Sequence, residues 1–380
     1  MTPPENGSPE TTPMISFRSV TKSYEGSPAP AVENLNLDIE RGSVTVFVGP
    51  SGCGKTTSLR MINRMVEPTS GTIVVDGTDV SAVKAPDLRR SMGYVMQSSG
   101  LLPHRTVLDN VATVPRLNGQ SKARARARAA ELLEVVGLSP ALGRRYPAQL
   151  SGGQQQRVGV ARALAADPPV LLMDEPFSAV DPVVRAELQQ ELLRLQRDLA
   201  KTIVFVTHDI DEATILGDKV AVFAVGGRLA QYAAPEEILR APVDDFVAGF
   251  VGRDRGFRHL AFQPGRNVPL HPVQLLAPEQ LADPRIPVDG NWALAVDGAS
   301  RPLGWVPAGR RTEITSAAAL VPGGSLYREG DTLRSALDAA LSSPSGLGVA
   351  VDAEGRVAGA IRPAEVLSLI EQARLLRNAG

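Results

Sequence analysis

The sequence predicts an α/β domain with a mixed central sheet, followed by a smaller α+β domain. Short, almost continuous apolar runs occur at 44–48, 170–173, 203–206 and 220–224. Runs of this kind are typical of parallel strands buried between helices, and helical periodicity precedes the last three. The composition changes near Gly252, beyond which Pro-rich and Gly-rich stretches follow and no lysine occurs. A chain of 380 residues is long enough for two such domains.

The composition excludes several classes of protein. Hydrophobic residues make up 43% and charged residues 21%, which is ordinary for a folded chain and unlike a disordered one. The 40 Lys and Arg nearly balance the 41 Asp and Glu, so no global charge attracts the chain to nucleic acid, and no nucleic-acid partner is predicted. The single cysteine, Cys53, excludes an internal disulfide. No apolar run approaches the ~20 residues that span a bilayer, which predicts a soluble protein.

Strand patterns dominate the beginning of the first domain. Alternation at 15–20 and apolar runs at 35–39, 44–48 and 73–75, with polar and glycine-containing turns between them, predict an early antiparallel part. Helical periodicity then prevails from about 121 to 166, which predicts a helical insertion before the remaining strands.

A phosphate-binding motif follows the apolar strand at 44–48. The segment 49–56, GPSGCGKT, fits G-x-x-x-x-G-K-[ST] and precedes a helical pattern. Its glycines let the backbone direct successive N–H groups at one anion, and the helix adds its positive end. Lys55 supplies a charge for the β- and γ-phosphates, and the Thr56 hydroxyl can ligate Mg²⁺. The motif therefore predicts a triphosphate-binding site, to which Cys53 is expected to contribute only its backbone amide.

Two carboxylates follow the apolar strand at 170–173. Parallel α/β sheets place their chemistry at the carboxyl ends of such strands, where Asp174 and Glu175 stand here. Asp174 can hold Mg²⁺ through its water shell. Glu175 can polarise the water that attacks the γ-phosphate, a role typically worth ~10²–10⁴ in rate. The two motifs together predict hydrolysis of a bound triphosphate.

Between these motifs lies LSGGQQQR at 150–157, which resembles the signature sequence of ABC-transporter ATPases. The resemblance covers about residues 15–251 and implies a P-loop NTPase fold of the ABC type, with an antiparallel β subdomain and a helical subdomain. It also implies that Tyr24 stacks on adenine, Gln97 senses Mg²⁺ and the attacking water, and His208 contacts the γ-phosphate. Taken singly, an exposed tyrosine or a histidine at a helix start is usually structural; their order and spacing favour the functional interpretation.

The resemblance thus carries a set of site residues. The predicted catalytic residues are Glu175, His208 and Gln97. The predicted nucleotide-binding residues are Tyr24, Gly49, Ser51, Gly52, Cys53, Gly54, Lys55, Thr56, Thr57, Ser151, Gly152, Gly153, Gln154 and Asp181 of the D-loop. The predicted metal ligands are Thr56, Gln97 and Asp174.

Ser151 precedes a helical stretch. The start of that helix is predicted to be a second anion-binding site. In the family each ATP lies between the Lys55 loop of one subunit and the Ser151 loop of the other. Because this chain carries one copy of each loop, the resemblance implies a second copy of the chain as partner, in a head-to-tail, ATP-dependent dimer.

Further motifs narrow the resemblance. They are similar to those of importers of glycine betaine, choline, carnitine and related quaternary amines, which are compatible solutes. These motifs are MINR at 61–64, EPTSG at 67–71, GYVMQ at 93–97 and LLPH at 101–104. The implied protein is an ATP-hydrolysing subunit bound peripherally to the cytoplasmic side of the cell membrane. Its implied partners are transmembrane permease subunits and, indirectly, an extracellular solute-binding protein.

Other functions stay open from the sequence. An amino acid or ergothioneine is an alternative solute for the same kind of importer. A soluble ABC ATPase that acts on ribosomes or DNA usually carries two cassettes or a long coiled-coil insertion, which this sequence does not show. A regulatory module that only binds ATP is disfavoured by the presence of Glu175 and His208.

The second domain contains an internal repeat. LAVD at 294–297 recurs as VAVD at 349–352, and the offset of 55 residues holds at later positions too. Each copy predicts strand, turn and strand, and the second continues into a helix from Pro363. The importers named above carry a C-terminal pair of CBS motifs, which this repeat resembles. The predicted organisation is a flexible tail at 1–13, an ABC ATPase domain at 14–251, a linker at 252–270 and a divergent CBS-like tandem at 271–380.

The CBS resemblance departs from the family pattern at one place. Arg362 and Glu365 in one copy, and Pro307 and Arg310 in the other, stand where a nucleotide-binding CBS motif has Thr or Ser and then Asp. The sequence therefore does not favour adenine-nucleotide sensing. From Arg258 onward, 12 Arg face 12 acidic residues, so no basic field favours sensing at anionic lipid either. Structural, dimer-stabilising and regulatory roles stay open.

Overall fold

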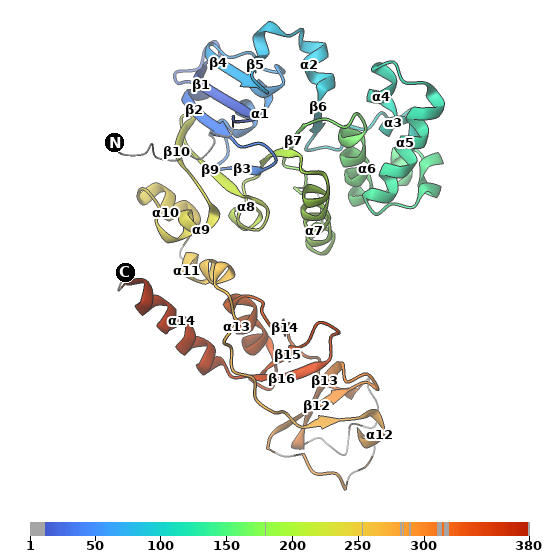
Figure 1. The fold of residues 1–380 in the computed structure, drawn as a ribbon, viewed down its shortest axis with the longest axis vertical. Coiled ribbons are helices and arrows are strands. Elements are labelled where there is room, and N and C mark those ends of the chain that lie inside the picture. The colour runs from blue at the N-terminus through green and yellow to red at the C-terminus, as the bar shows by residue number, and fades with distance from the viewer. Residues whose placement is uncertain are drawn as a thin grey trace, which may run out of the picture. The chain divides into compact units, whose positions relative to one another are not determined.

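The structure is a computed structural model that describes residues 12–178, 180–252, 254–281, 283, 285–288, 290–309, 314 and 319–378. The chain divides into two units, each compact through its own internal contacts: residues 1–252 and residues 253–380 (Figure 1). The predicted flexible tail lies outside the described residues except for its last two positions. Arg310 also lies outside the described residues.

The first unit begins with an antiparallel sheet of strand order β2-β1-β4-β5. Its strands are β1 (Ile15–Lys22), β2 (Val32–Ile39), β4 (Ser70–Val75) and β5 (Thr78–Asp79). Phe17 on β1 lies opposite Leu37 on β2 and Ile73 on β4, and all three are buried. The early antiparallel part is therefore confirmed, with one face of the sheet packed on the core.

A mixed central sheet follows, with strand order β10-β9-β3-β8-β7-β6. All neighbours are parallel except β10, which runs antiparallel to β9. The strands are β3 (Val44–Val48), β6 (Met92–Val95), β7 (Val170–Asp174), β8 (Thr202–Val206), β9 (Lys219–Ala224) and β10 (Arg228–Ala233). Every residue of β3, β7 and β8 is buried, which confirms the predicted parallel strands.

One expectation differs in detail. The successive apolar runs at 35–39 and 44–48 are strands, but β2 and β3 lie in different sheets and do not pair with each other. The turn between them carries the chain from the antiparallel sheet to the central sheet. One core joins the two sheets, and Phe47 of β3 packs against Phe223 of β9 within it, with ring centroids 5.1 Å apart.

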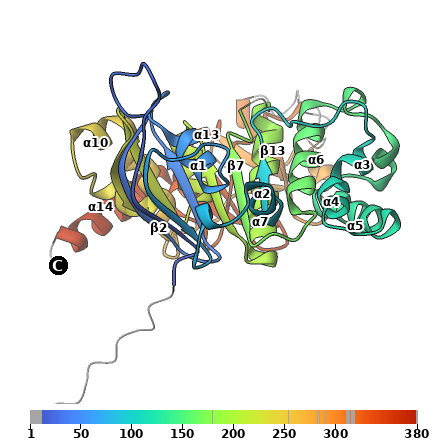
Figure 2. The ribbon, with the colours of Figure 1, turned by 90° about the horizontal axis from the view of Figure 1, so that it is seen from above.

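Helices flank the central sheet. They are α1 (Lys55–Ile62), α2 (Ala85–Ser91), α3 (Val107–Val111), α4 (Thr113–Leu117), α5 (Lys122–Val135), α6 (Gly152–Leu164), α7 (Pro182–Leu199), α8 (Ile210–Leu216), α9 (Pro235–Arg240) and α10 (Asp245–Val251). Figures 1 and 2 both show α3 to α6 gathered on one side of the central sheet, with the antiparallel sheet on the other. This group contains the predicted helical insertion.

The second unit repeats one strand arrangement, and its sheets have the orders β11-β12-β13 and β14-β15-β16. In each sheet the first strand is parallel to the second, and the second is antiparallel to the third. The strands are β11 (Leu275–Leu276), β12 (Trp292–Val296), β13 (Pro302–Pro307), β14 (Leu326–Arg328), β15 (Gly348–Val351) and β16 (Val357–Ile361). The helices are α11 (Arg255–His259), α12 (Pro278–Leu281), α13 (Leu333–Ser342) and α14 (Pro363–Asn378).

The repeat keeps its register in space. Leu294 pairs with Trp305, and Val349, 55 residues further on, pairs with Ala360. Leu294, Trp305 and Val349 also share one apolar cluster, so the two sheets pack on each other. Within the described residues, no helix combines the length and the apolar character that crossing a membrane requires.

Candidate functional site

The glycine-rich loop between β3 and α1 has a shape that only glycine allows at two positions. Gly49 has φ 148° and Gly54 has φ 91°. A Cβ atom at Gly49 would lie 2.3 Å from the Phe223 carbonyl oxygen, and one at Gly54 would lie 2.2 Å from that of Ala31. The loop borders a cavity of about 260 Å³. Its lining residues are Ala31, Ser51, Gly52, Cys53, Gly54, Lys55, Thr56, Thr57 and Glu175.

Lys55 and Cys53 are both buried in this loop. The Lys55 ammonium donates hydrogen bonds to the carbonyl oxygens of Gly49 at 2.8 Å and Pro50 at 2.9 Å. The Cys53 sulfur lies 3.7 Å from the same ammonium. Burial raises the pKa of the Cys53 thiol, so the thiol stays protonated and is a poor nucleophile.

The oxygen atoms of Thr56 and Asp174 meet at the inner end of the loop. The Thr56 hydroxyl donates to Asp174 Oδ1 at 2.8 Å, and Asp174 is only 3% exposed. A hydroxyl and a carboxylate are oxygen ligands of the kind that Mg²⁺ takes beside a bound phosphate. The residues present at this place therefore fit a magnesium ion.

Glu175 follows Asp174 directly and lines the same cavity. Its φ of 43° is unusual for a residue with a side chain, and such backbone strain gathers at functional sites. Gln97 Nε2 donates to Glu175 Oε2 at 3.2 Å, and His208 Nδ1 lies 3.5 Å from the same oxygen. The structure thus brings all three predicted catalytic side chains together.

A buried carboxylate lies behind His208. Glu212, 7% exposed, accepts a hydrogen bond from the Thr207 hydroxyl at 2.6 Å. Burial raises the pKa of Glu212. Thr207 also accepts a hydrogen bond from the Asp209 N–H, so this side chain fixes the turn that carries His208.

The remaining predicted site residues do not line the cavity. Ser151 begins α6 with a capping box: its Oγ accepts the Gln154 N–H at 3.3 Å, and Gln154 Oε1 accepts the Ser151 N–H at 3.1 Å. Gly152 and Gly153 form the first turn of that helix. Asp181 accepts the Val183 N–H before α7. Tyr24 is 46% exposed, and Lys22 Nζ lies 4.9 Å from its ring centre.

Motif-based reasoning missed two side chains that touch Asp174. Arg60 Nη2 donates to Asp174 Oδ2 at 3.1 Å, and the Tyr94 hydroxyl donates to it at 3.3 Å. Burial raises the pKa of Tyr94 to about 12, so its hydroxyl stays a donor. One signal was present for Arg60, which stands four residues after Thr56 and therefore on the same helix face.

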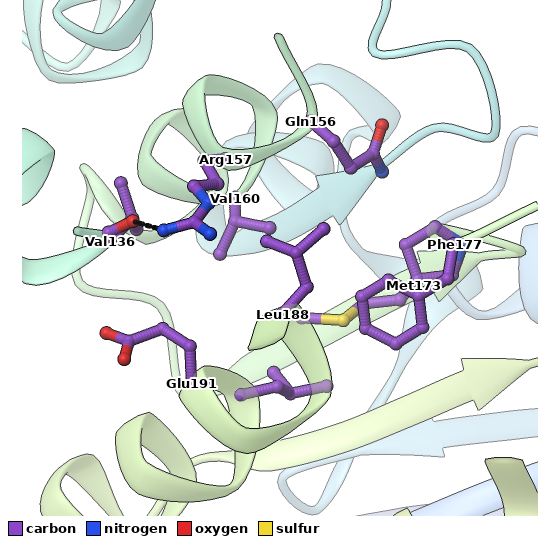
Figure 3. A pocket seen from close by; sticks show the side chains of 10 residues that line it. Val136, Gln156, Arg157, Val160, Met173, Phe177, Leu188 and Glu191 are labelled. Carbon is purple, nitrogen blue, oxygen red and sulfur yellow. Dashed lines mark hydrogen bonds between the residues drawn. The ribbon is translucent and has the colours of Figure 1, made fainter. Parts of the chain in front are cut away.

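A second cavity, between α6, α7 and β7, is too small for a substrate. It measures about 20 Å³, which leaves room for about one water. Figure 3 shows its apolar lining by Val160, Met173, Phe177 and Leu188. We therefore assign no ligand to it.

Fold and site together define a nucleoside triphosphatase of the phosphate-loop class. A family model described as ABC transporter matches residues 32–178. The osmoprotectant import ATP-binding protein OsmV of Salmonella typhimurium is 40% identical over 96% of this chain and 98% of its own length. The chain therefore belongs to the family of ABC transporter ATP-binding proteins. Membership confirms the predicted ATP hydrolase, which uses ATP and Mg²⁺ and is coupled to transport.

Other relatives match about two thirds of this chain. The choline transport ATP-binding protein OpuBA of Bacillus subtilis is 49% identical over 64% of this chain and 63% of its own. The glycine betaine uptake system ATP-binding protein YehX of Escherichia coli is 51% identical over 66% of this chain and 80% of its own. A dimeric structure of the ATP-binding cassette MJ0796, bound to ADP and Pi, aligns with a TM-score of 0.54 at 35% identity. It covers 58% of this chain and 99% of that one, which confirms the predicted ABC-type fold.

Proposed function

We propose that this chain is the ATP-hydrolysing subunit of an importer for an osmoprotectant such as glycine betaine, choline or carnitine. The observation that carries the proposal is the relative OsmV, named for osmoprotectant import, whose similarity extends through both units of this chain. Relatives named for choline and glycine betaine uptake support the same class of solute.

The geometry suggests a role for each side chain. Lys55 and the loop amides bind the phosphates, while Thr56 and Asp174 hold Mg²⁺, which offsets the negative charge of the transferred phosphoryl group when bound. Glu175 orients the attacking water and accepts a proton from it as a general base. Gln97 and His208, which both approach Glu175 Oε2, hold that carboxylate and contact the γ-phosphate side of the site.

A second copy of the chain completes the proposed site. Ser151 and Gly153 stand at the start of α6, away from the cavity that Lys55 lines in the same chain. Free N–H groups at a helix start attract a phosphate. In a head-to-tail dimer this helix start faces the nucleotide of the partner, as does the D-loop residue Asp181.

The proposed location is the cytoplasmic side of the cell membrane, on permease subunits. The segment 101–104, just before α3, belongs to the proposed contact with them. A solute-binding protein outside the membrane would deliver the solute to the permease.

The experiment that tests the solute class is deletion of the gene in its host, followed by uptake of radiolabelled solutes at high osmolarity. We expect uptake of glycine betaine, choline or carnitine to disappear. The wild-type gene should restore it, whereas a Glu175→Gln copy should not. Loss of amino-acid or ergothioneine uptake instead would contradict the solute class. Co-purification with ribosomes or DNA, without a membrane protein, would contradict the importer.

Tyr24 is the proposed adenine platform. Stacking of a base on an aromatic ring is worth ~1–3 kcal/mol, so Tyr24→Ala should weaken ADP binding about 5- to 150-fold. Tyr24→Phe should bind nearly as the wild type does, because the ring remains. Calorimetric titration with ADP measures both affinities. Tyr146→Ala is the matched control, since Tyr146 is 47% exposed; equal affinities for Tyr24→Ala and this control would exclude the stack.

We also propose that the ATPase domain at 14–251 is followed by a linker at 252–270 and a divergent CBS-like tandem at 271–380. The repeated strand arrangement supports this division. Glu365 stands where such motifs place the carboxylate that holds a ribose. Here its Oε2 lies 2.6 Å from His271 Nε2, so an internal partner already engages it. That pairing favours a structural or dimer-stabilising role over nucleotide sensing.

A further inference from the structure

The carboxylate of Asp174 is held from two sides. Its side chain ends β7 and is 4% exposed. Oδ1 accepts the hydrogen bond of the Thr56 hydroxyl at 2.8 Å. Oδ2 accepts one from Arg60 Nη2 at 3.1 Å and one from the Tyr94 hydroxyl at 3.3 Å. With these donors in place, the carboxylate cannot rotate without losing at least one hydrogen bond.

Two elements of the fold deliver the donors to Oδ2. Thr56 and Arg60 are four residues apart on α1, so their side chains lie on one face of that helix. Tyr94 on β6 pairs with Leu172 on β7, and residues two apart on a strand face the same side, so Tyr94 faces the side that Asp174 faces. Arg60 Nε donates to the Tyr94 hydroxyl at 3.4 Å, so the two residues that contact Asp174 Oδ2 also contact each other.

Among the proposed site residues, Asp174 accepts side-chain hydrogen bonds from Arg60 and Tyr94. Neither is among the described residues that line the phosphate cavity. The guanidinium of Arg60 supplies the positive charge that a buried carboxylate needs, and hydrogen bonds between charged groups are the stronger ones. Their combined effect is to fix the orientation of the Asp174 carboxylate, with one oxygen facing Thr56 and the other facing Arg60 and Tyr94.

We propose that Arg60 and Tyr94 are positioning residues of the magnesium site, which hold Asp174 Oδ2 and thereby keep Oδ1 beside the Thr56 hydroxyl. This inference rests on the proposed function, because it takes Thr56 and Asp174 as the residues that hold Mg²⁺. Side chains that orient metal ligands typically change metal affinity 10- to 100-fold when they are replaced. The two residues therefore raise the affinity for the cation and leave the affinity for the nucleotide without the cation unchanged.

The test measures cation binding directly and needs no turnover. Mn²⁺ is titrated into the full chain with bound ADP, and free Mn²⁺ is followed by electron paramagnetic resonance. We expect Arg60→Gln to weaken Mn²⁺ binding about 10- to 100-fold. Tyr94→Phe, which removes one neutral donor, should weaken it about 2- to 12-fold. Arg60→Lys should fall between the wild type and Arg60→Gln, because it keeps the charge but not the planar fork.

A second readout separates cation binding from nucleotide binding. In EDTA, calorimetric titration with ADP should give the wild-type affinity for Arg60→Gln and for Tyr94→Phe. Arg18→Gln is the matched control: the Arg18 side chain is 54% exposed against 45% for Arg60, and it pairs with Asp38 at 2.9 Å in the antiparallel sheet. This control should bind Mn²⁺ as the wild type does.

The outcomes distinguish the positioning role of Arg60 and Tyr94 from the proposed magnesium site itself. If Asp174→Asn weakens Mn²⁺ binding while Arg60→Gln and Tyr94→Phe do not, the positioning role is overturned and the proposed site stands. If Asp174→Asn also leaves Mn²⁺ binding unchanged, the proposed magnesium site itself fails, and the inference with it. Thermal unfolding checks each variant; if Arg60→Gln does not fold, Tyr94→Phe, which keeps the packed ring, decides.

Discussion

Replacing Glu175 by glutamine should lower the rate of ATP hydrolysis about 10²–10⁴-fold while leaving ATP binding intact. The amide has the shape of the carboxylate and can still accept the hydrogen bond from Gln97, but it cannot take a proton from water. The proposed phosphate contacts come from Lys55 and the glycine-rich loop, so the affinity for ATP should persist. The variant should therefore accumulate as an ATP-bound dimer.

Phosphate release measures the rate, and size-exclusion chromatography with ATP and Mg²⁺ measures the dimer. Glu131→Gln is a suitable control. Glu131 is a 62% exposed carboxylate on α5 that pairs with Arg128 at 2.9 Å, and it has no proposed part in the reaction. Full ATPase activity of the Glu175→Gln variant would remove Glu175 from the role proposed for it.

The second large effect concerns the backbone of the phosphate loop. Gly54→Ala should weaken ADP binding at least 100-fold, which corresponds to about 2.8 kcal/mol. The new Cβ would stand 2.2 Å from the carbonyl oxygen of Ala31, a backbone atom that cannot swing away. The φ of 91° adds a cost of roughly 1–2 kcal/mol for a residue with a side chain. The loop must shift, and its N–H groups then no longer converge on the phosphates.

Gly119→Ala separates the steric from the conformational part of that effect. Gly119 has φ 84°, close to that of Gly54, but a Cβ there would meet no atom within 4 Å. Its thermal unfolding midpoint should fall slightly, with ADP affinity unchanged by calorimetry. If Gly54→Ala binds ADP as well as this control does, the contact between the loop and the Ala31 backbone is not what shapes the site.

The chemistry of the site could be predicted because short continuous segments of the sequence contain the residues that perform it. The loop at 49–56 carries its own glycines, charge and hydroxyl, and a strand and a helix flank it as the motif requires. Asp174 and Glu175 follow a run that is apolar at every position, which marks a buried strand and the place where it ends. The structure places Glu175 beside the loop, and Gln97 and His208 beside Glu175.

Other features depend on which segments meet. Apolar runs at 35–39 and 44–48 predict two strands, yet the pattern does not say that β2 and β3 enter different sheets. Arg60 and Tyr94 lie 114 and 80 residues before Asp174 in the sequence, so no local spacing predicts their contacts with it. The same holds for His271 and Glu365, which are 94 residues apart.

The sequence by itself determined the reaction: a triphosphate-binding loop, a carboxylate pair and a family signature each lie within a short segment of the chain and can be recognised there before the segments meet. Only the tertiary structure decided how the carboxylates are held. Strand order places β6 next to β7, and α1 packs against β7, so the hydrogen bonds from Tyr94 and Arg60 to Asp174 form only once these elements meet. Orientation of Asp174 by Arg60 and Tyr94 is therefore a property of the assembled sheet.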